Sequence, residues 1–191
     1  MPHPHDEVAA ATDRYRELRE AIARGEQSWP ALADLFTEDA VYIDPAWGRI
    51  EGRDEIRTFM EESMTGLEDW TFPIEFIAIE GDQVVVKWTQ ELPGTKPDGT
   101  RWSQSGYSTL LYAGDGRFSY EEDLLNMAHV IEDIVASGWT PGPGFTPPPA
   151  QPGRDTSRSG WAGGGVKPGP GVQPLATMSS MTWAMLSRSS S

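Results

Sequence analysis

The sequence predicts an α+β fold in which helices come first, antiparallel strands follow, and the helices gather against one face of a curved sheet. Apolar residues recur at spacings of three and four through most of residues 6–64, which is typical of amphipathic helices. From about residue 71 to residue 123 the apolar period is two, which is typical of strands. A strongly bent sheet over helices leaves a cone that a small domain cannot fill with side chains, so a ligand cavity is expected.

The first helix is expected from Asp6 to Arg24, and Gly25 closes it. Its apolar residues alternate at spacings of three and four and so share one face: Val8, Ala11, Tyr15, Leu18 and Ile22. Tyr15 therefore points into the protein. A cap at Ser28 and a first turn at Trp29-Pro30 predict a short second helix.

A strand from Val41 to Asp44 follows the second helix and ends directly before Pro45. A turn through Pro45 to Gly52 then leads into a third helix, whose first turn holds Asp54 and Glu55, where the helix dipole favours acids. The inward residues of this helix are Ile56, Phe59, Met60 and Met64.

Four strands are expected in the second half of the domain. Their ranges are about 71–80, 84–92, 101–112 and 117–123, with a tight turn at Gly81-Asp82, a loop at 93–99 and a turn at 114–116. The segment 124–137 is predicted to be a last helix that stops at Gly138.

The composition of the chain changes sharply near Trp139. Residues 1–5 are expected to be a flexible N-terminus, residues 6–139 a single domain, and residues 140–191 a disordered tail rich in Pro, Gly and Ser. Of the 29 acids, 28 lie in residues 1–139 together with 11 of the 15 basic residues, which gives this part a net charge of −17. Such a field repels phosphate backbones and anionic lipid surfaces, so neither nucleic acid nor a membrane is an expected partner.

Several classes of protein are disfavoured by what the sequence lacks. Without cysteine there are no disulfides, thiolate metal sites or cysteine nucleophiles. The N-terminus has no secretory signal pattern, and no run approaches the roughly 20 apolar residues of a membrane span, so a cytoplasmic location is the default expectation. No phosphate-binding, dinucleotide or nucleophile-elbow motif occurs. His129 has no second histidine at ligand spacing, so no metal is expected.

Acidic residues stand at the ends of two predicted strands. Asp44 ends the first strand, and the run Glu121-Glu122-Asp123 ends the last one. Burial among aromatic side chains would raise the pKa of Asp44, and a second acid nearby would raise the pKa of one member of the pair further. Such a pair can act as acid and base near neutral pH. The alternatives are that Asp44 only accepts hydrogen bonds in an Asp-Pro turn and that none of the last three acids is catalytic.

The chain resembles the nuclear transport factor 2-like superfamily, which includes SnoaL-like polyketide cyclases, ketosteroid isomerase and limonene epoxide hydrolase, from about residue 8 to residue 137. The pieces that carry the resemblance are Leu35-Phe36 with Glu38-Asp39-Ala40, then Asp44-Pro45, then Gly52-Arg53-Asp54-Glu55-Ile56, then Gly114-Asp115-Gly116-Arg117-Phe118. The resemblance implies the cone-shaped fold. It leaves the reaction open, because functions in this superfamily are diverse.

The resemblance also implies roles for single residues. Asp44 stands where ketosteroid isomerase keeps its general base, and Asp123 stands where relatives keep an acid that lines the cavity. Leu18 takes the place of the isomerase's oxyanion tyrosine, with Tyr15 one turn earlier on the same helix face. Ser108 takes the place of its protonated acid, so steroid isomerisation by that mechanism is not implied.

The register of the last strand stays open. The resemblance places Asp123 in the cavity, whereas alternation of hydrophobic residues places Phe118, Tyr120 and Glu122 inward, and a slip of one residue exchanges the two faces. The resemblance to the epoxide hydrolase implies an arginine between two acids, and Glu122 stands at the position of that arginine.

The leading hypothesis is a protein that binds a small apolar, cyclic or polyketide-like molecule and carries out cyclase or isomerase chemistry, for which no cofactor is needed. Asp44 would accept a proton, Asp123 or Glu121 would supply the second carboxylate, and Tyr15 would donate a hydrogen bond to a developing oxyanion. The expected substrate-binding residues are Tyr42, Trp47, Phe59, Trp88 and Ser108. The alternative is a non-catalytic ligand-binding or dimerisation module, and the expected assembly is a homodimer through the sheet.

Overall fold

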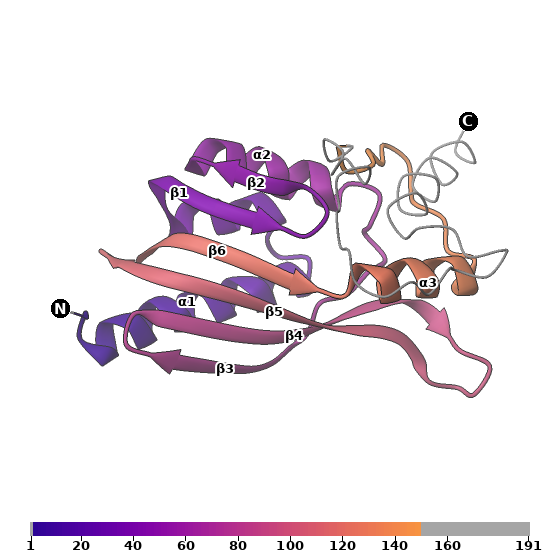
Figure 1. Ribbon diagram of the computed structural model, residues 1–191, viewed down its shortest axis with the longest axis horizontal. Helices are drawn as coiled ribbons and strands as arrows, with labels where there is room; N and C mark the ends of the chain where they lie inside the picture. Colours follow the sequence, from indigo (N-terminus) through magenta and orange to yellow (C-terminus); the bar gives the residue numbers. More distant parts are fainter. Residues whose placement is uncertain (1, 150–191) are drawn as a thin grey trace, which may run out of the picture.

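Six strands form one curved sheet, and helices cover its concave side (Figure 1). The computed structural model describes residues 2–149. The strands lie in the order β2-β1-β6-β5-β4-β3, which confirms the predicted α+β class. In chain order the elements are α1 (His5–Ala23), the 3₁₀ helix η1 (Trp29–Leu35), β1 (Phe36–Asp44), β2 (Gly48–Glu51), α2 (Arg53–Met64), β3 (Ile74–Glu80), β4 (Gln83–Thr95), β5 (Arg101–Gly114), β6 (Arg117–Leu125) and α3 (Met127–Ser137).

One strand pair departs from the predicted antiparallel sheet: β1 runs parallel to β6. The other four pairs between these strands are antiparallel. The chain reaches β1 from the helix η1 and not from a hairpin, so no tight turn fixes its direction. Because Ile43 on β1 pairs with Glu122 on β6, Asp44 at the end of β1 comes close to Asp123 near the end of β6, and both line the cavity.

The predicted turn through Pro45 to Gly52 contains an additional short strand, β2. Asp44 Oδ1 accepts hydrogen bonds from the backbone N–H groups of Ala46 and Trp47, each at 2.7 Å. This tightens the turn enough for the chain to reverse within a few residues and to pair with β1.

The last helix begins later than the sequence predicts. β6 continues to Leu125, and Asn126 caps α3 by accepting a hydrogen bond from His129 N at 3.3 Å. Gly138 ends the helix in the left-handed conformation, with φ 67°, and this confirms the predicted stop.

A β-bulge in β6 decides which acids face inward. Two consecutive residues of β5 pair with Phe118 and Tyr120, so Ser119 between them is an extra residue. The bulge brings Phe118 and Glu121 to the same buried face, although they are three positions apart. Hydrophobic alternation is therefore right for Phe118, before the bulge, and wrong for Tyr120 and Glu122 after it, which do not line the cavity. The resemblance is right for Asp123, which does line the cavity.

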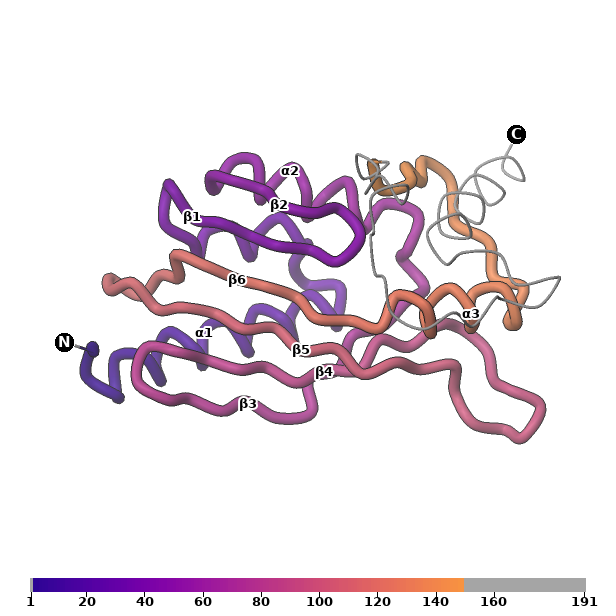
Figure 2. Tube along the Cα trace, in the orientation of Figure 1, coloured from indigo at the N-terminus to yellow at the C-terminus, as the bar shows by residue number. Residues whose placement is uncertain are grey.

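Both ends of the described range contact the rest of the fold. His3 N donates a hydrogen bond to Asp82 Oδ1 at 2.8 Å. Gly142 N donates to Gly66 O at 2.9 Å, which holds the segment after α3 against the loop after α2 (Figure 2). The domain boundaries at residues 6 and 139 stay predictions, and residues 150–191 of the predicted tail lie outside the described residues. Within residues 2–149, no helix has the length and apolar character needed to cross a membrane.

Candidate active site

A cavity of about 150 Å³ opens between the concave face of the sheet, α1, α2 and the start of α3. Its wall is mostly aromatic and aliphatic, and a cavity of this size accommodates a single ring. Three acids predicted from the sequence, Asp44, Glu121 and Asp123, all line it, and so does Tyr15. The fold thus brings together residues from α1, β1 and β6.

Asp44 ends β1, and the turn that follows holds its carboxylate in place. The two backbone N–H groups that bind Oδ1 give Asp44 the structural role expected of an Asp-Pro turn, whereas Oδ2 has no hydrogen-bond partner among residues 2–149. Burial and then the charge of Asp123 raise the pKa of Asp44 to about 6, while the two backbone hydrogen bonds act in the opposite direction. Asp44 is therefore mostly ionised at neutral pH.

Asp123 accepts hydrogen bonds from two hydroxyl groups. Tyr42 on β1 donates to Oδ2 at 2.6 Å, and Ser108 on β5 donates to Oδ1. Ser108 in turn accepts a hydrogen bond from Trp88 Nε1 at 3.0 Å. Burial raises the pKa of Asp123 above its usual value, although the two hydroxyl groups favour the carboxylate. Both oxygens of Asp123 are therefore engaged by the protein.

Glu121 lies two residues before Asp123 and is almost completely buried. Its Oε1 accepts a hydrogen bond from Tyr15 Oη at 3.0 Å, whereas Oε2 has no hydrogen-bond partner among residues 2–149. Burial and then the charge of Asp123 raise the pKa of Glu121 to about 8, against the opposing charge of Arg19. At neutral pH the cavity therefore holds a carboxylate at Asp44 and a carboxylic acid at Glu121.

Arg19 is a site residue that the sequence reasoning misses. It lies one turn after Tyr15 on α1, is 8% exposed, and donates from Nη1 to Tyr15 Oη at 3.0 Å and from Nη2 to Phe72 O at 3.3 Å. Its guanidinium carbon is 4.9 Å from the ring centre of Trp29. The signal that could have identified it is a charged residue on the apolar face of a helix. The cation near the acids thus comes from the first helix, and not from the last strand at Glu122.

Aromatic side chains form the wall beside the acids. The ring of Phe59 on α2 packs against Tyr42 and Trp47, with ring centres 5.1 and 5.8 Å apart. Trp88 on β4 lies over Gly106, its partner on β5. The four aromatic residues predicted to bind substrate all line the cavity: Tyr42, Trp47, Phe59 and Trp88.

Ser108, the fifth residue predicted to bind substrate, lies behind this wall. It is 1% exposed, is absent from the cavity lining, and meets the site through its hydrogen bond to Asp123. Glu122 accepts a hydrogen bond from Tyr120 Oη and belongs to the outer face of the sheet. Within the described part of the chain, no group of three or more His, Cys, Asp or Glu side chains is arranged to hold a metal ion.

Comparison with solved structures confirms the fold. A protein from Jannaschia sp. CCS1, assigned as a SnoaL-like polyketide cyclase, superposes with a TM-score of 0.54 at 16% identity, over 71% of this chain and 98% of that one. An NTF2-like protein of unknown function from Burkholderia pseudomallei superposes with a TM-score of 0.53 at 20% identity, over 68% of this chain and 98% of that one. TerC, co-crystallised with polyporic acid, superposes with a TM-score of 0.52 at 18% identity, also over 68% of this chain and 98% of that one. At these identities the likeness shows the fold alone.

The sequence comparisons are more specific about the family. No curated protein matches the chain. A family model of the SnoaL-like domain matches residues 15–120, which is more than half of the chain. The match begins at Tyr15 and spans Asp44 and the aromatic wall. The chain belongs to the SnoaL-like domain family.

Proposed function

We propose that this protein binds a small apolar, ring-containing molecule and catalyses a cofactor-free proton transfer on it, of the cyclase or isomerase kind. The supporting observation is that one cavity is lined by two acids in different surroundings: Asp44 accepts two backbone hydrogen bonds, whereas Glu121 is almost completely buried and has one oxygen without a hydrogen-bond partner among residues 2–149. The pKa of Asp44 is about 6 and that of Glu121 is about 8, so between these values Asp44 accepts a proton and Glu121 donates one.

Asp44 is the proposed base. The backbone holds its Oδ1, so Oδ2 takes the proton from a carbon next to a ligand carbonyl, and the electrons of the C–H bond form an enolate. A hydrogen bond from neutral Glu121 stabilises the enolate oxygen. Return of the proton from Asp44 to another carbon completes an isomerisation. Attack of the enolate carbon on a second carbonyl, with protonation of the new alkoxide by Glu121, completes a cyclisation.

Tyr15 and Asp123 support these two acids. The hydroxyl of Tyr15 has one proton, which it donates to Glu121, so in this proposal Tyr15 aligns Glu121. The predicted hydrogen bond from Tyr15 to an oxyanion requires Tyr15 to release Glu121 first. The charge of Asp123 keeps Glu121 protonated, and Arg19 balances part of the negative charge of the site.

The cavity wall supports a flat apolar ligand. Aromatic rings on β1, β4 and α2 offer stacking surfaces, and the polar groups are concentrated near the ends of β1 and β6. The structurally similar TerC was co-crystallised with polyporic acid, which supports a small molecule as the occupant of a cavity in this fold.

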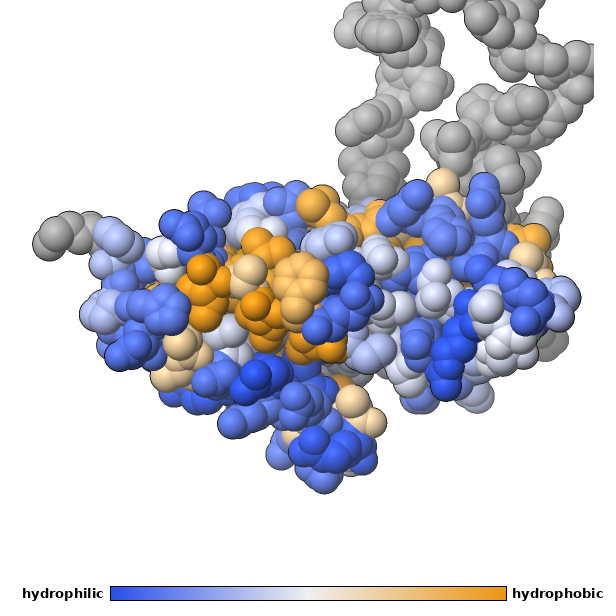
Figure 3. Space-filling view, turned by 90° about the horizontal axis from the view of Figure 1, so that it is seen from below, coloured by the Kyte–Doolittle hydropathy of each residue, from blue (hydrophilic) through white to orange (hydrophobic). Residues whose placement is uncertain are grey.

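A homodimer through the outer face of the sheet is the proposed assembly. Large apolar side chains on this face are exposed: Phe76, Tyr107, Leu111 and Leu124. The view from below shows apolar side chains gathered on the side of the molecule where β3 lies (Figure 3). Exposed apolar patches of this kind mark surfaces that bind another protein.

The isomerisation of cyclohex-3-en-1-one to its conjugated isomer tests the catalytic proposal, because it needs only the removal and return of one proton. The product is measured by its ultraviolet absorbance. Asp44→Asn should lower kcat/KM by about 100-fold or more, while ligand affinity stays within about tenfold. Asp39→Asn is the matched control, because Asp39 is an exposed aspartate on the same strand. Full activity of Asp44→Asn would remove Asp44 from the mechanism.

A further inference from the structure

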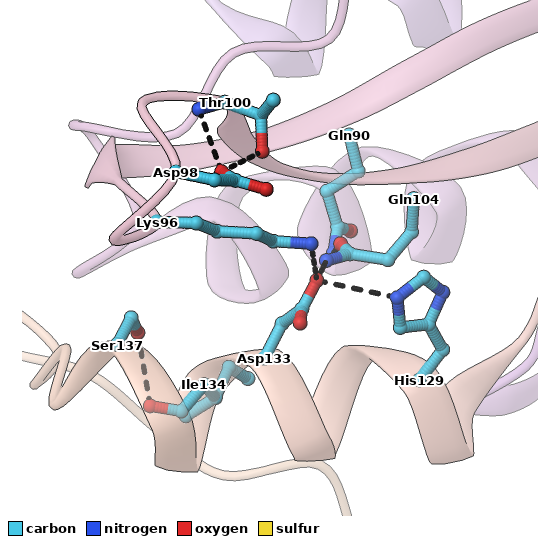
Figure 4. A network of polar contacts seen from close by, with 9 residues as sticks. All are labelled: Gln90, Lys96, Asp98, Thr100, Gln104, His129, Asp133, Ile134 and Ser137. Atoms are coloured by element: carbon cyan, nitrogen blue, oxygen red, sulfur yellow. Dashed lines mark hydrogen bonds and ion pairs between the residues drawn. The ribbon is translucent and has the colours of Figure 1, made fainter.

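A chain of polar side chains leads from Gln90 through Gln104 to Asp133 on α3 (Figure 4). Gln90 on β4 lines the cavity and stands opposite Gln104 on β5. Gln90 Nε2 donates to Gln104 Oε1 at 2.9 Å, and Gln104 Nε2 donates to Asp133 Oδ2 at 2.6 Å. All three side chains are buried, with exposures of 4%, 2% and 6%. A buried, continuous chain of this kind holds each member in one orientation.

Asp133 determines the direction of this chain. A carboxylate only accepts hydrogen bonds, so Gln104 must turn its amide nitrogen toward Asp133 and its oxygen toward Gln90. Gln90 must then use its own nitrogen for Gln104. The oxygen of the Gln90 amide is left as the free end, without a hydrogen bond from residues 2–149. The two ends of a carboxamide have nearly the same shape, so only this chain of partners decides which one a ligand meets.

Two basic side chains support Asp133 from the outside. Lys96 Nζ lies 3.7 Å and His129 Nε2 lies 3.4 Å from the same Oδ2 atom that Gln104 binds. Figure 4 shows them on either side of Asp133, which points from α3 toward the two glutamines. Lys96 supplies the opposite charge that a buried carboxylate needs.

We propose that Gln90 is a specificity-determining residue of the cavity, whose amide oxygen selects ligands with a hydrogen-bond donor, such as a hydroxyl group on the ring. Asp133 is the positioning residue that sets this polarity through Gln104. The inference rests on the proposed function in taking this cavity as the ligand site. Trp88 lies two residues before Gln90 on the same face of β4, or about 7 Å along the strand. Gln90 and Trp88 therefore contact different parts of the ligand, and the part that Gln90 contacts lies nearer α3.

Phenol and anisole test this selection, because they differ in whether the oxygen on the ring carries a proton. Their affinities are measured by titration, followed by the indole NMR signals of the cavity tryptophans. Gln90→Met keeps the volume of the side chain and removes the amide. It should weaken phenol binding about five- to tenfold and change anisole binding less than about twofold.

Asp133→Asn tests the positioning role, since an asparagine can donate as well as accept and so permits the whole chain to reverse. The ratio of phenol to anisole affinity should fall at least about threefold, and adding Gln90→Met should weaken phenol binding no further than Gln90→Met alone. Glu132→Gln is the matched control, because it removes the same charge from an exposed neighbour on α3 and should leave the ratio unchanged.

Three results would overturn the inference: an affinity ratio unchanged in Gln90→Met or in Asp133→Asn, additive losses in the double variant, or no binding of phenol to the wild type. A general weakening of the fold by Asp133→Asn would lower both affinities equally and leave the ratio unchanged. Asp44→Asn should retain the Gln90 effect. Failure of the catalytic proposal would instead appear as absent cyclohexenone turnover with the phenol selectivity intact.

Discussion

Asp44 and Glu121 line the same cavity, but their pKa values differ because different atoms surround the two carboxyl groups. Two backbone N–H groups hold Oδ1 of Asp44, and hydrogen bonds of this kind favour a carboxylate. Glu121 has one hydroxyl donor and one oxygen without a partner among the described residues, and it stands two residues from Asp123. Deeper burial, together with the negative charge of Asp123, therefore keeps the proton on Glu121 up to a higher pH.

Glu121→Gln should change how stability depends on pH, because glutamine resembles the neutral acid and does not titrate. The pKa of Glu121 in the folded protein, about 8, lies above its ordinary value of 4.5. Its stabilising contribution is thus fully present below pH 4.5 and is lost as the pH rises through 8. In urea unfolding, the free energy of unfolding of the variant should increase relative to that of the wild type between pH 5 and pH 8, by on the order of 3 kcal/mol.

The control for this series is Glu122→Gln, which removes the neighbouring carboxylate from the outer face of the sheet. A stability difference between Glu121→Gln and the wild type that stays constant from pH 5 to 8 would show that Glu121 is already ionised at the acid end of this range.

Single residues of the site could be predicted from sequence only where their type is unusual in its place. Asp44 could be named because it ends a strand directly before Pro45, and Tyr15 because it lies on an apolar helix face. Asp123 could be named because the family resemblance implies an acid at its position. Arg19 lies on that same face, but a long basic side chain usually reaches solvent. Gln90 stands in an ordinary alternating strand, and its role depends on Gln104 and on a helix more than 40 residues away.

At the scale of elements, the helices and the long strands could be predicted because their apolar periods extend over many residues. β2 could not, since its four residues are too few for a period and its pairing follows a turn that the side chain of Asp44 holds. The faces of β6 could not be assigned either. An extra residue at Ser119 exchanges the two faces within the strand, and alternation alone contains no sign of it.

The pairing of β4 with β5 makes a prediction about Gly106. A Cβ atom at this position would lie 2.4 Å from carbon atoms of the Trp88 indole. Gly106→Ala should therefore displace Trp88, break its hydrogen bond to Ser108, and lower the free energy of unfolding by about 1–3 kcal/mol. Urea unfolding measures the loss. Ser105→Ala, on the exposed face of the same strand, is the control, and equal stability of the two variants would mean that Trp88 has room to move.

At the scale of the whole molecule, the apolar outer face of the sheet predicts the assembly. Leu111 is 41% exposed on β5, a central strand of the sheet, and a charge there should prevent two sheets from packing together. Light scattering should give the wild type about twice the chain mass of 21.0 kDa, and Leu111→Lys the mass of one chain. Val135→Lys places the same charge on an exposed apolar residue of α3 and should leave the dimer intact. A monomeric wild type would refute this assembly.

The fold as a whole could be predicted more fully than its chemistry. The α+β cone could be predicted from the order of helices and strands and from a few short pieces such as Asp44-Pro45. The structure and the family match confirm this fold. The chemistry depends on distances between β1, β6 and α1, which are set by packing and not by any local pattern. The protonation states of the acids follow from those distances.

The most direct test of the central claim, that Asp44 and Glu121 work as base and acid, is the pH dependence of kcat/KM for cyclohexenone isomerisation. The rate should rise as Asp44 ionises near pH 6, and fall as Glu121 loses its proton near pH 8. In Glu121→Gln the fall near pH 8 should disappear, whereas in Asp44→Asn the whole profile should drop to the level of buffer. An isomerisation rate with the wild type that equals the rate in buffer alone, or one that rises steadily through pH 8 and above, would contradict this account.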